Sequence, residues 1–247
     1  MDYKIVICSH DRIHTVKKKT LMVLDKYQIP KDKIFIFVAE DEEDAYREAL
    51  VGYRICPGEK GLNNQRNAVT RYFEQDDHLF CLDDDITGFY CSSNKKLIPL
   101  DNLDQFIRYG FKTAVQEHCS LWSLYPVKNA LWLKNTITTG LVFCYGCCFG
   151  LINKKDVLIE GQLKEDYERT LKFYKRDGSV LRLNYVAPAQ SYKKGKGGLS
   201  SYRTDERERK ECEALVLQYP DLCRIKEGKE RVDLAFNKKN ARAKARD

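Results

Sequence analysis

The sequence predicts an α/β domain with a mixed central sheet and a Rossmann-like first half. Short apolar runs of the buried-strand type, at 5–7, 34–39 and 79–82, alternate with segments whose apolar residues recur at helical spacing. Such alternation is typical of parallel strands joined by helical crossovers. The chain has 247 residues, 43% hydrophobic and 11% aromatic, which is enough for the core of one large domain.

The spacing of apolar residues also places the helices. In the first half it predicts helices at 15–27, 44–51 and 63–74. In the second half it predicts them at 103–115, with Asp101 or Asn102 as the cap, and at 166–174 and 207–219. Residues 138–152 are expected to be extended, and 181–186 to form one strand.

No internal repeat or linker composition divides the chain, so we expect a single domain over 1–247. Residues 1–90 hold the Rossmann-like strands and 91–237 make the other half. Residues 238–247 are rich in lysine and arginine and are expected to be a mobile basic tail.

The composition excludes several classes of protein. The ten cysteines are irregularly spaced and do not suggest a disulfide frame. Cys144-x-x-Cys147-Cys148 has no second C-x-x-C pair, so we expect these cysteines to be buried in a strand rather than to bind zinc. Charges at Asp2 and Lys4 argue against a signal peptide, and no apolar stretch is long enough for a membrane span. We therefore expect a reduced cytosolic protein. Its formal charge of +7 favours an anionic partner.

A run of three aspartates, Asp83 to Asp85, directly follows the apolar run 79–82. Ligands of open α/β sheets bind at the carboxyl ends of the strands. Adjacent carboxylates repel one another unless a cation lies between them, and Mg²⁺ or Mn²⁺ takes one or two carboxylates together with phosphate oxygens and water. The run therefore predicts a metal–diphosphate site, with a solvated turn of capping aspartates as the alternative.

Two further segments favour a nucleotide at this place. Ser9-His10-Asp11-Arg12 follows the first predicted strand, and 61–67 begins a helix with amides and an arginine. Helix amino-termini and arginines both favour anionic groups. No G-x-G-x-x-G follows the first strand and no G-x-x-x-x-G-K-[ST] occurs, which argues against the usual dinucleotide fold and against a P-loop ATPase.

Taken in order, these segments resemble GT-A glycosyltransferases. More narrowly they resemble the TET/JBP-associated glycosyltransferases, the family of the base J glucosyltransferase and its phage relatives. The matching segments are 9–12 (S-x-x-R), 20–24 (T-L-x-x-L), 37–46 (beginning F-V-A), 61–67 (G-L-x-x-Q-R-N) and 82–86 (L-D-D-D-I). The resemblance implies a single GT-A-like domain, with 1–90 as the donor-nucleotide half and 91–237 as the acceptor half.

The resemblance also implies an activity. Glucose would pass from UDP-glucose to the hydroxymethyl group of a 5-hydroxymethylpyrimidine in DNA, hydroxymethyluracil being favoured, by an inverting and metal-dependent reaction. Asp83 and Asp85 would hold Mn²⁺ or Mg²⁺, with Asp85 as the direct ligand and Asp84 near the ribose or sugar. The donor-binding residues expected are Ser9, Arg12, Glu40, Arg66, Asp83, Asp84 and Lys196. Many GT-A enzymes add a late histidine ligand, and no histidine follows His118 here.

An inverting transfer needs a base, because the acceptor hydroxyl has a pKa far above 7. Many inverting GT-A enzymes carry it at a helix start such as Lys164-Glu165-Asp166, and we expect Asp166 to be the base, with Glu165 as the alternate. The alternative is that these acids only complement the helix dipole. The Gly/Lys loop 193–203, which includes Lys196, is a lid over the diphosphate, a contact to DNA or a solvated loop.

Other functions remain open at this stage. The acceptor could instead be a polysaccharide, a protein or a lipid, or the chain could be a nucleic-acid-binding module without catalysis, although the aspartate run argues against the last. The expected partners are UDP-glucose and hydroxymethylated DNA, and no membrane association is expected. We expect a monomer in the cytoplasm, which would be the host cytoplasm if the source is a phage. Aromatic candidates for stacking an extruded base are Phe89, Tyr90, Trp122, Tyr125 and Trp132.

Overall fold

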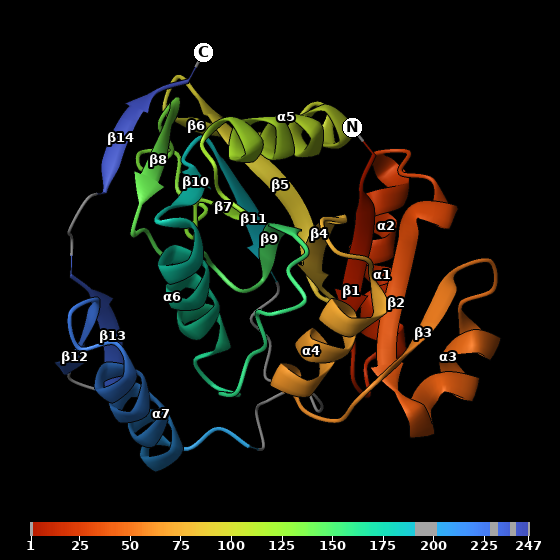
Figure 1. Ribbon diagram of the computed structural model, residues 1–247. Helices are drawn as coiled ribbons and strands as arrows, with labels where there is room; N and C mark the ends of the chain where they lie inside the picture. Colours follow the sequence, from red (N-terminus) through yellow and green to blue (C-terminus); the bar gives the residue numbers. More distant parts are fainter. Residues whose placement is uncertain (1, 191–201, 228–231, 238–240, 247) are drawn as a thin grey trace.

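The computed structural model describes residues 2–190, 202–227, 232–237 and 241–246. Within these ranges a nine-stranded sheet runs in the order β14-β8-β10-β7-β9-β4-β1-β2-β3 (Figure 1). Its strands are β1 Lys4–Cys8, β2 Ile34–Ala39, β3 Arg54–Gly58, β4 His78–Asp83, β7 Leu121–Leu124, β8 Thr136–Gly140, β9 Cys148–Ile152, β10 Val180–Leu183 and β14 Arg242–Ala245. Two smaller sheets hold β5 Ile86–Ser93, β6 Lys96–Pro99 and β11 Val186–Gln190, and β12 Cys223–Glu227 with β13 Val232–Phe236.

The large sheet is parallel in one half and mixed in the other. Strands β3, β2, β1 and β4 are parallel neighbours. Strand β9 then pairs antiparallel with both β4 and β7, while β10 is parallel to β7 and antiparallel to β8. This confirms the predicted α/β class, with a Rossmann-like half and a mixed central sheet.

Helices cover both faces of the sheet. Successive side chains of a strand point to opposite faces, so each face is apolar and forms its own core. In β1, Ile5 and Ile7 pack into one core and Val6 into the other. The first core lies under α1 Ile13–Lys18, α2 Thr20–Lys26, α3 Glu43–Ala49 and α5 Leu103–Gln116. The second lies under α4 Leu62–Tyr72 and α6 Glu165–Asp177, which cover the face turned toward the viewer in Figure 1.

A third apolar cluster joins the last described helix to the rest. Helix α7, Asp205–Gln218, packs Cys212 and Leu215 against Leu171 of α6, with Leu234 of β13 beside them. In Figure 1, α7 and the β12–β13 hairpin lie beside α6, at the lower left of the molecule. Helix α6 is therefore also supported from outside the large sheet.

The helix predicted over 15–27 is wrong in one respect, because two helices, α1 and α2, are separated at Lys19, whose φ is −123° and ψ −86°. The break places Thr20, which is fully buried, against the turn that follows β4. Its hydroxyl donates to the Asp83 carbonyl at 2.8 Å and accepts from the Ile86 backbone N–H at 3.0 Å. A helix start thus holds the turn that carries the aspartates.

Two expectations for the second half are also corrected. The strand expected at 181–186 is two strands, β10 and β11, because Asn184 turns inward and its amide donates to the hydroxyls of Thr136 and Thr138 at 3.0 and 2.8 Å. The basic tail, which was expected to be mobile, contains a strand in its described part, since β14 pairs antiparallel with β8 and Lys244 forms an ion pair with Glu117 at 2.6 Å.

All ten cysteines are free, and Cys144, Cys147 and Cys148 are buried. In the part of the chain that the structure describes, no helix is both long and apolar enough to cross a membrane.

Candidate active site

The site begins where β1 and β4 end side by side. Cys8 is in register with Asp83, so the residues that follow, Ser9 and Asp84, are neighbours. The Ser9 hydroxyl donates to Asp84 Oδ2 at 2.8 Å, and the Tyr46 hydroxyl lies 2.8 Å from the same Ser9 oxygen. Arg12 donates to the other oxygen of Asp84 at 3.2 Å. Both oxygens of the buried Asp84 are therefore bound by the protein.

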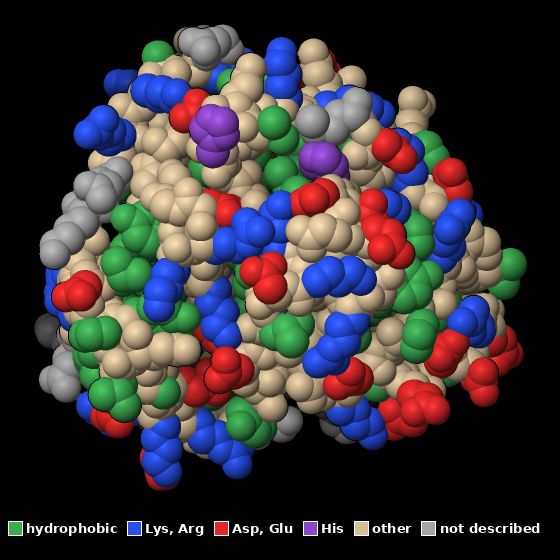
Figure 2. Space-filling view, viewed as in Figure 1, with side chains coloured by type: hydrophobic (Ala, Val, Ile, Leu, Met, Phe, Trp, Pro, Cys, Tyr) green, Lys and Arg blue, Asp and Glu red, His purple; other side chains and the backbone are tan. Residues whose placement is uncertain are grey.

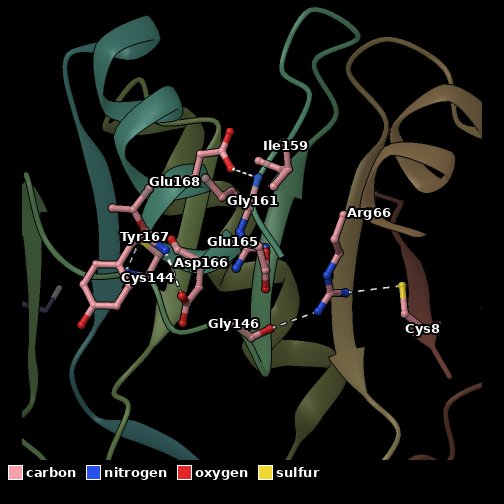
Figure 3. A network of polar contacts seen from close by, with 12 residues as sticks. Cys8, Arg66, Cys144, Gly146, Ile159, Gly161, Glu165, Asp166, Tyr167 and Glu168 are labelled. Carbon is pink, nitrogen blue, oxygen red and sulfur yellow. Dashed lines mark hydrogen bonds and ion pairs between the residues drawn. The ribbon is translucent and has the colours of Figure 1, made fainter. Parts of the chain in front are cut away.

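Asp83 is held from two other elements. Arg66 of α4 is buried and donates to Asp83 Oδ1 at 3.3 Å, while its guanidinium also reaches the Gly146 carbonyl at 3.3 Å and the Cys8 sulfur at 3.5 Å (Figure 3). Gln190, the last residue of β11, donates to Asp83 Oδ2 at 3.1 Å. Arg66 was expected near the donor, and here it contacts Asp83 and lines a cavity described below.

Asp85 differs from its two neighbours. Its Oδ1 is buried and makes no hydrogen bond within the described residues. Burial, followed by the charge of Asp84, raises the pKa of Asp85. Burial also raises the pKa of Asp84, and it raises that of Asp83 to about 6 even though Arg66 opposes the shift. A cation beside these carboxylates would reverse that effect.

Two cavities meet at these carboxylates. The first has a volume of about 310 Å³ and the second of about 490 Å³, and Asp83 and Asp85 line both. Arg12, Leu62 and Gln162 complete the shared rim. Each volume lies in the range of small-ligand sites. Two ligands, one in each cavity, would therefore meet beside Asp83 and Asp85.

The first cavity follows the strand ends and the start of α4. Its cationic side chains are Arg12 and Lys60, with His10 beside them. Gly61, the residue before α4, has φ +96°, a conformation that favours glycine, and it lets the chain turn at the cavity wall. The remaining lining residues are Cys8, Ser9, Glu59, Leu62, Gln65, Asp83, Asp84, Asp85, Gln162 and Tyr202. Cations and a helix start along one wall suit a phosphate ester.

The second cavity holds the candidate base. Asp166 lies in the first turn of α6, where its Oδ1 accepts the Tyr167 N–H at 2.9 Å, and it lines this cavity together with Phe143 and Tyr145. Burial, and then the neighbouring charge of Glu165, raises the pKa of Asp166 to about 7. A carboxylate with this pKa is suited to accept a proton near neutral pH.

Glu165 is less suited to that role. It is buried and forms an ion pair with Arg169, one turn further along α6. Arg169 also stacks on Phe149, with the guanidinium carbon 3.7 Å from the ring centroid. The Glu165 carboxylate is therefore already engaged by a buried guanidinium. Of the two expected acids, the geometry favours Asp166.

The residues at the aspartate run fit a divalent cation. Asp85 offers a buried oxygen without a protein partner in the described part, and Asp83 faces the same two cavities. Among the described residues, no three side chains of the His, Cys, Asp or Glu type gather to hold an ion. An ion here would need phosphate oxygens and water to complete its shell, as Mg²⁺ and Mn²⁺ commonly do.

Other expected residues lie elsewhere. Glu40, at the start of the short helix Glu40–Glu42, is exposed and lines neither cavity as the described residues define them. Lys196 and most of the Gly/Lys loop lie outside the described residues. Of the aromatic candidates, Phe89 and Trp122 are buried in the core, and Trp132 is exposed away from the residues that line the cavities.

Among the residues that line the cavities, the sequence did not point to Tyr145, Gln162 or Gln190. The Tyr145 hydroxyl donates to Gln190 Oε1 at 2.9 Å, so these two side chains connect the second cavity to Asp83. Gln190 ends a strand, as the aspartates do, and correct bounds for β11 would have identified it.

No family model matches the chain, and no curated protein matches it in sequence. Among solved structures it is similar to a mycobacterial protein, with 11% identity and a TM-score of 0.54 over 95% of this chain and 83% of that one. It is also similar to 4-diphosphocytidyl-2C-methyl-D-erythritol synthase from Anaerococcus prevotii, with 11% identity and a TM-score of 0.44 over 78% and 92% of the two chains. The first similarity shows the fold alone, and the second is too remote to bear on function.

Proposed function

We propose that the protein is a nucleotide-sugar glycosyltransferase of the TET/JBP-associated type. It would transfer glucose from UDP-glucose to the hydroxymethyl group of a 5-hydroxymethylpyrimidine in DNA, hydroxymethyluracil being favoured, with inversion. The observation that carries the proposal is the meeting of two cavities at Asp83 and Asp85, with Asp166 on the wall of the second. The choice of donor and acceptor rests on the resemblance of the first 90 residues to that family.

In this proposal the first cavity takes the nucleotide. Arg12 and Lys60 face its phosphates, and the first turn of α4 adds backbone N–H groups. Mn²⁺ or Mg²⁺ held by Asp83 and Asp85 would stabilise negative charge on the leaving diphosphate. Arg66 and Gln190 fix the direction of the Asp83 carboxylate.

The second cavity takes the acceptor. Asp166 removes the proton from the acceptor hydroxyl as the oxygen attacks C1 of the sugar and the bond from C1 to the diphosphate breaks. Phe143, Tyr145 and Tyr167 give the cavity an aromatic side, with 4.5 Å between the ring centroids of Phe143 and Tyr167. Aromatic side chains commonly stack on a base extruded from a duplex, which supports a nucleobase acceptor.

One observation favours a carbohydrate acceptor instead. Besides the charged residues at the start of α6 and on the rim that the two cavities share, four charged side chains line the second cavity, namely Arg66, Arg203, Glu208 and Asp233. Such a lining offers partners to several hydroxyl groups. In Figure 2 lysine and arginine side chains are interspersed with acidic ones on the visible face, so the positive charge is not gathered there into one patch.

The test is to incubate the protein with UDP-glucose and Mn²⁺ and with duplexes that contain hydroxymethyluracil, hydroxymethylcytosine or thymine. A glucosylated nucleoside in the digest of a hydroxymethylated duplex alone is the expected result. UDP-glucose hydrolysis without transfer to any duplex would remove DNA as the acceptor and leave the nucleotide-sugar part standing. The absence of both transfer and donor binding would overturn the proposal.

Binding to DNA has its own signature. Each phosphate neutralised by a lysine or arginine contributes about −0.9 to the slope of log affinity against log salt. If the Gly/Lys loop binds DNA, changing Lys193, Lys194 and Lys196 to alanine should flatten the slope by about one unit for each phosphate that is no longer neutralised. An unchanged slope would assign the binding to other basic residues, with β14 the next to vary.

A further inference from the structure

The segment that leads into α6 is held by two carboxylates from different helices. The backbone N–H groups of Glu160 and Gly161 donate to Glu168 of α6, the closest contact being 2.8 Å from Gly161 (Figure 3). The next three N–H groups, those of Gln162, Leu163 and Lys164, donate to Glu211 of α7 at 3.2, 2.8 and 3.0 Å. Five consecutive backbone N–H groups therefore donate to two carboxylates.

Glu211 holds the residues that lead into α6. Lys164 is the residue before α6, and its side chain makes no capping hydrogen bond to the helix. The Lys164 ammonium instead forms ion pairs with Asp233 at 3.2 Å and Glu208 at 3.7 Å. Lys164 therefore does not cap the helix, and Glu211 from α7 holds the backbone of the three residues that lead into it.

Gly161 makes this arrangement possible. A Cβ atom there would lie 3.0 Å from Glu211 Oε2 and 3.3 Å from Glu168 Oε2, tighter than ordinary contacts. The absence of a side chain lets both carboxylates approach the same stretch of backbone. The residues that follow line the cavities: Gln162 faces both, and Asp166 lies four positions further on.

We propose that Glu211 is a positioning residue for Asp166 and Gln162, acting through the backbone of 162–164. The proposal rests on the proposed function, in which Asp166 is the base, and it adds α7 to the parts that the reaction requires. Glu211 lines neither cavity among the described residues, and two of the three residues that it holds, Leu163 and Lys164, line the second cavity but not the first, so its main effect should fall on the placement of the base. A misplacement of about 1 Å in a catalytic group costs about a hundredfold in rate.

The test compares Glu211→Leu, Glu211→Gln and the parent protein. Glu211→Leu removes the acceptor, so kcat for glucosyl transfer should fall by about tenfold to a hundredfold while the KM for UDP-glucose stays within about twofold. Glu211→Gln keeps one oxygen, which can still accept the N–H groups of Leu163 and Lys164, but its NH2 group then faces the Gln162 N–H. It should therefore restore kcat in part, to a value between those of Glu211→Leu and the parent. Glu213→Leu is the matched control, since Glu213 is exposed on the same helix.

A second measurement does not need turnover. Amide hydrogen exchange at Gln162, Leu163 and Lys164 should be at least about tenfold faster in Glu211→Leu than in the parent, with exchange in the strands unchanged. Unchanged exchange, a kcat within threefold of the parent, or a KM that rises in step with the fall in kcat would each overturn the inference. If the parent protein transfers no glucose, the proposed function is wrong. Hydrogen exchange alone then tests whether Glu211 holds the backbone of 162–164.

Gly161→Ala tests the same interaction without removing a carboxylate. The added methyl group would lie 3.0 Å from Glu211 Oε2 and 3.3 Å from Glu168 Oε2, so these carboxylates must shift by a few tenths of an ångström. This variant should therefore show a fall in kcat and faster exchange at 162–164 in the same direction as Glu211→Leu, but smaller. It also covers the case in which Glu211→Leu fails to fold. A Gly161→Ala protein with parental kcat and exchange would overturn the inference.

Discussion

Replacement of Asp166 by asparagine separates chemistry from binding. Asparagine has nearly the same size and can still accept the Tyr167 N–H that Asp166 accepts at 2.9 Å, so the helix start should be preserved. It cannot accept the proton of the acceptor hydroxyl. A positioned base contributes about 10²–10⁴ to the rate, so kcat should fall by that factor while the affinity for UDP-glucose changes little.

The raised pKa of Asp166 sets the pH dependence. Burial favours the neutral acid and brings its pKa to about 7, and only the carboxylate acts as a base. With that pKa, about half of the molecules carry the carboxylate at pH 7 and about a tenth at pH 6. Turnover should therefore rise with pH through about 7 and be about tenfold lower at pH 6 than on the plateau.

The assay is steady-state glucosyl transfer between pH 5.5 and 9, with donor affinity measured by calorimetry at each end. Asp156→Asn is the control, because Asp156 is exposed and lines neither cavity in the described part. If Asp166→Asn keeps more than a tenth of the parental kcat, or if its profile still falls below pH 7, Asp166 is not the base. The same change at Glu165 would then be the next test.

Other substitutions probe the metal site and the core. Asp85→Ala removes the carboxylate with an unpaired oxygen and should abolish Mn²⁺-dependent UDP binding in calorimetry, and parental binding would refute the metal assignment. Arg66→Met leaves Asp83 without its guanidinium partner and should lower the free energy of unfolding by about 2 kcal/mol in urea denaturation, whereas an unchanged midpoint would show that the pair is dispensable. Gly150→Ala would place a Cβ atom 2.0 Å from the buried Trp122 ring and should destabilise the protein by about 1–3 kcal/mol, measured in the same way.

The first half of the fold was predictable because its signals are local. The runs 5–7 and 34–39 alternate between two cores and became β1 and β2, with the bounds of β2 matching the prediction. The break between α1 and α2 was not predictable, because it depends on Thr20 contacting the turn after β4. The β14 strand was missed for a similar reason, since its alternation of basic residues and alanine has no apolar face and its pairing with β8 is a tertiary contact.

The site divides in the same way. The aspartate run and the first turn of α6 could be located from the sequence, because strand ends and helix starts are local features. The partners that orient them could not, since Gln190 lies 107 positions from Asp83 and Glu211 lies 47 from Lys164. Long-range hydrogen bonds of this kind leave no periodic pattern in the sequence.

The three neighbouring aspartates illustrate how a repeated residue can acquire separate roles. Asp83 is held by Arg66 on one oxygen and by Gln190 on the other, and Asp84 is bound by side chains that follow β1. Asp85 alone keeps a buried oxygen without a partner among the described residues. Because an unpaired buried oxygen is costly and the other two carboxylates are already bound, a cation would gain most from Asp85. This environment agrees with Asp85 as the direct ligand, and it explains why a motif of three identical residues needs the surrounding fold to be interpreted.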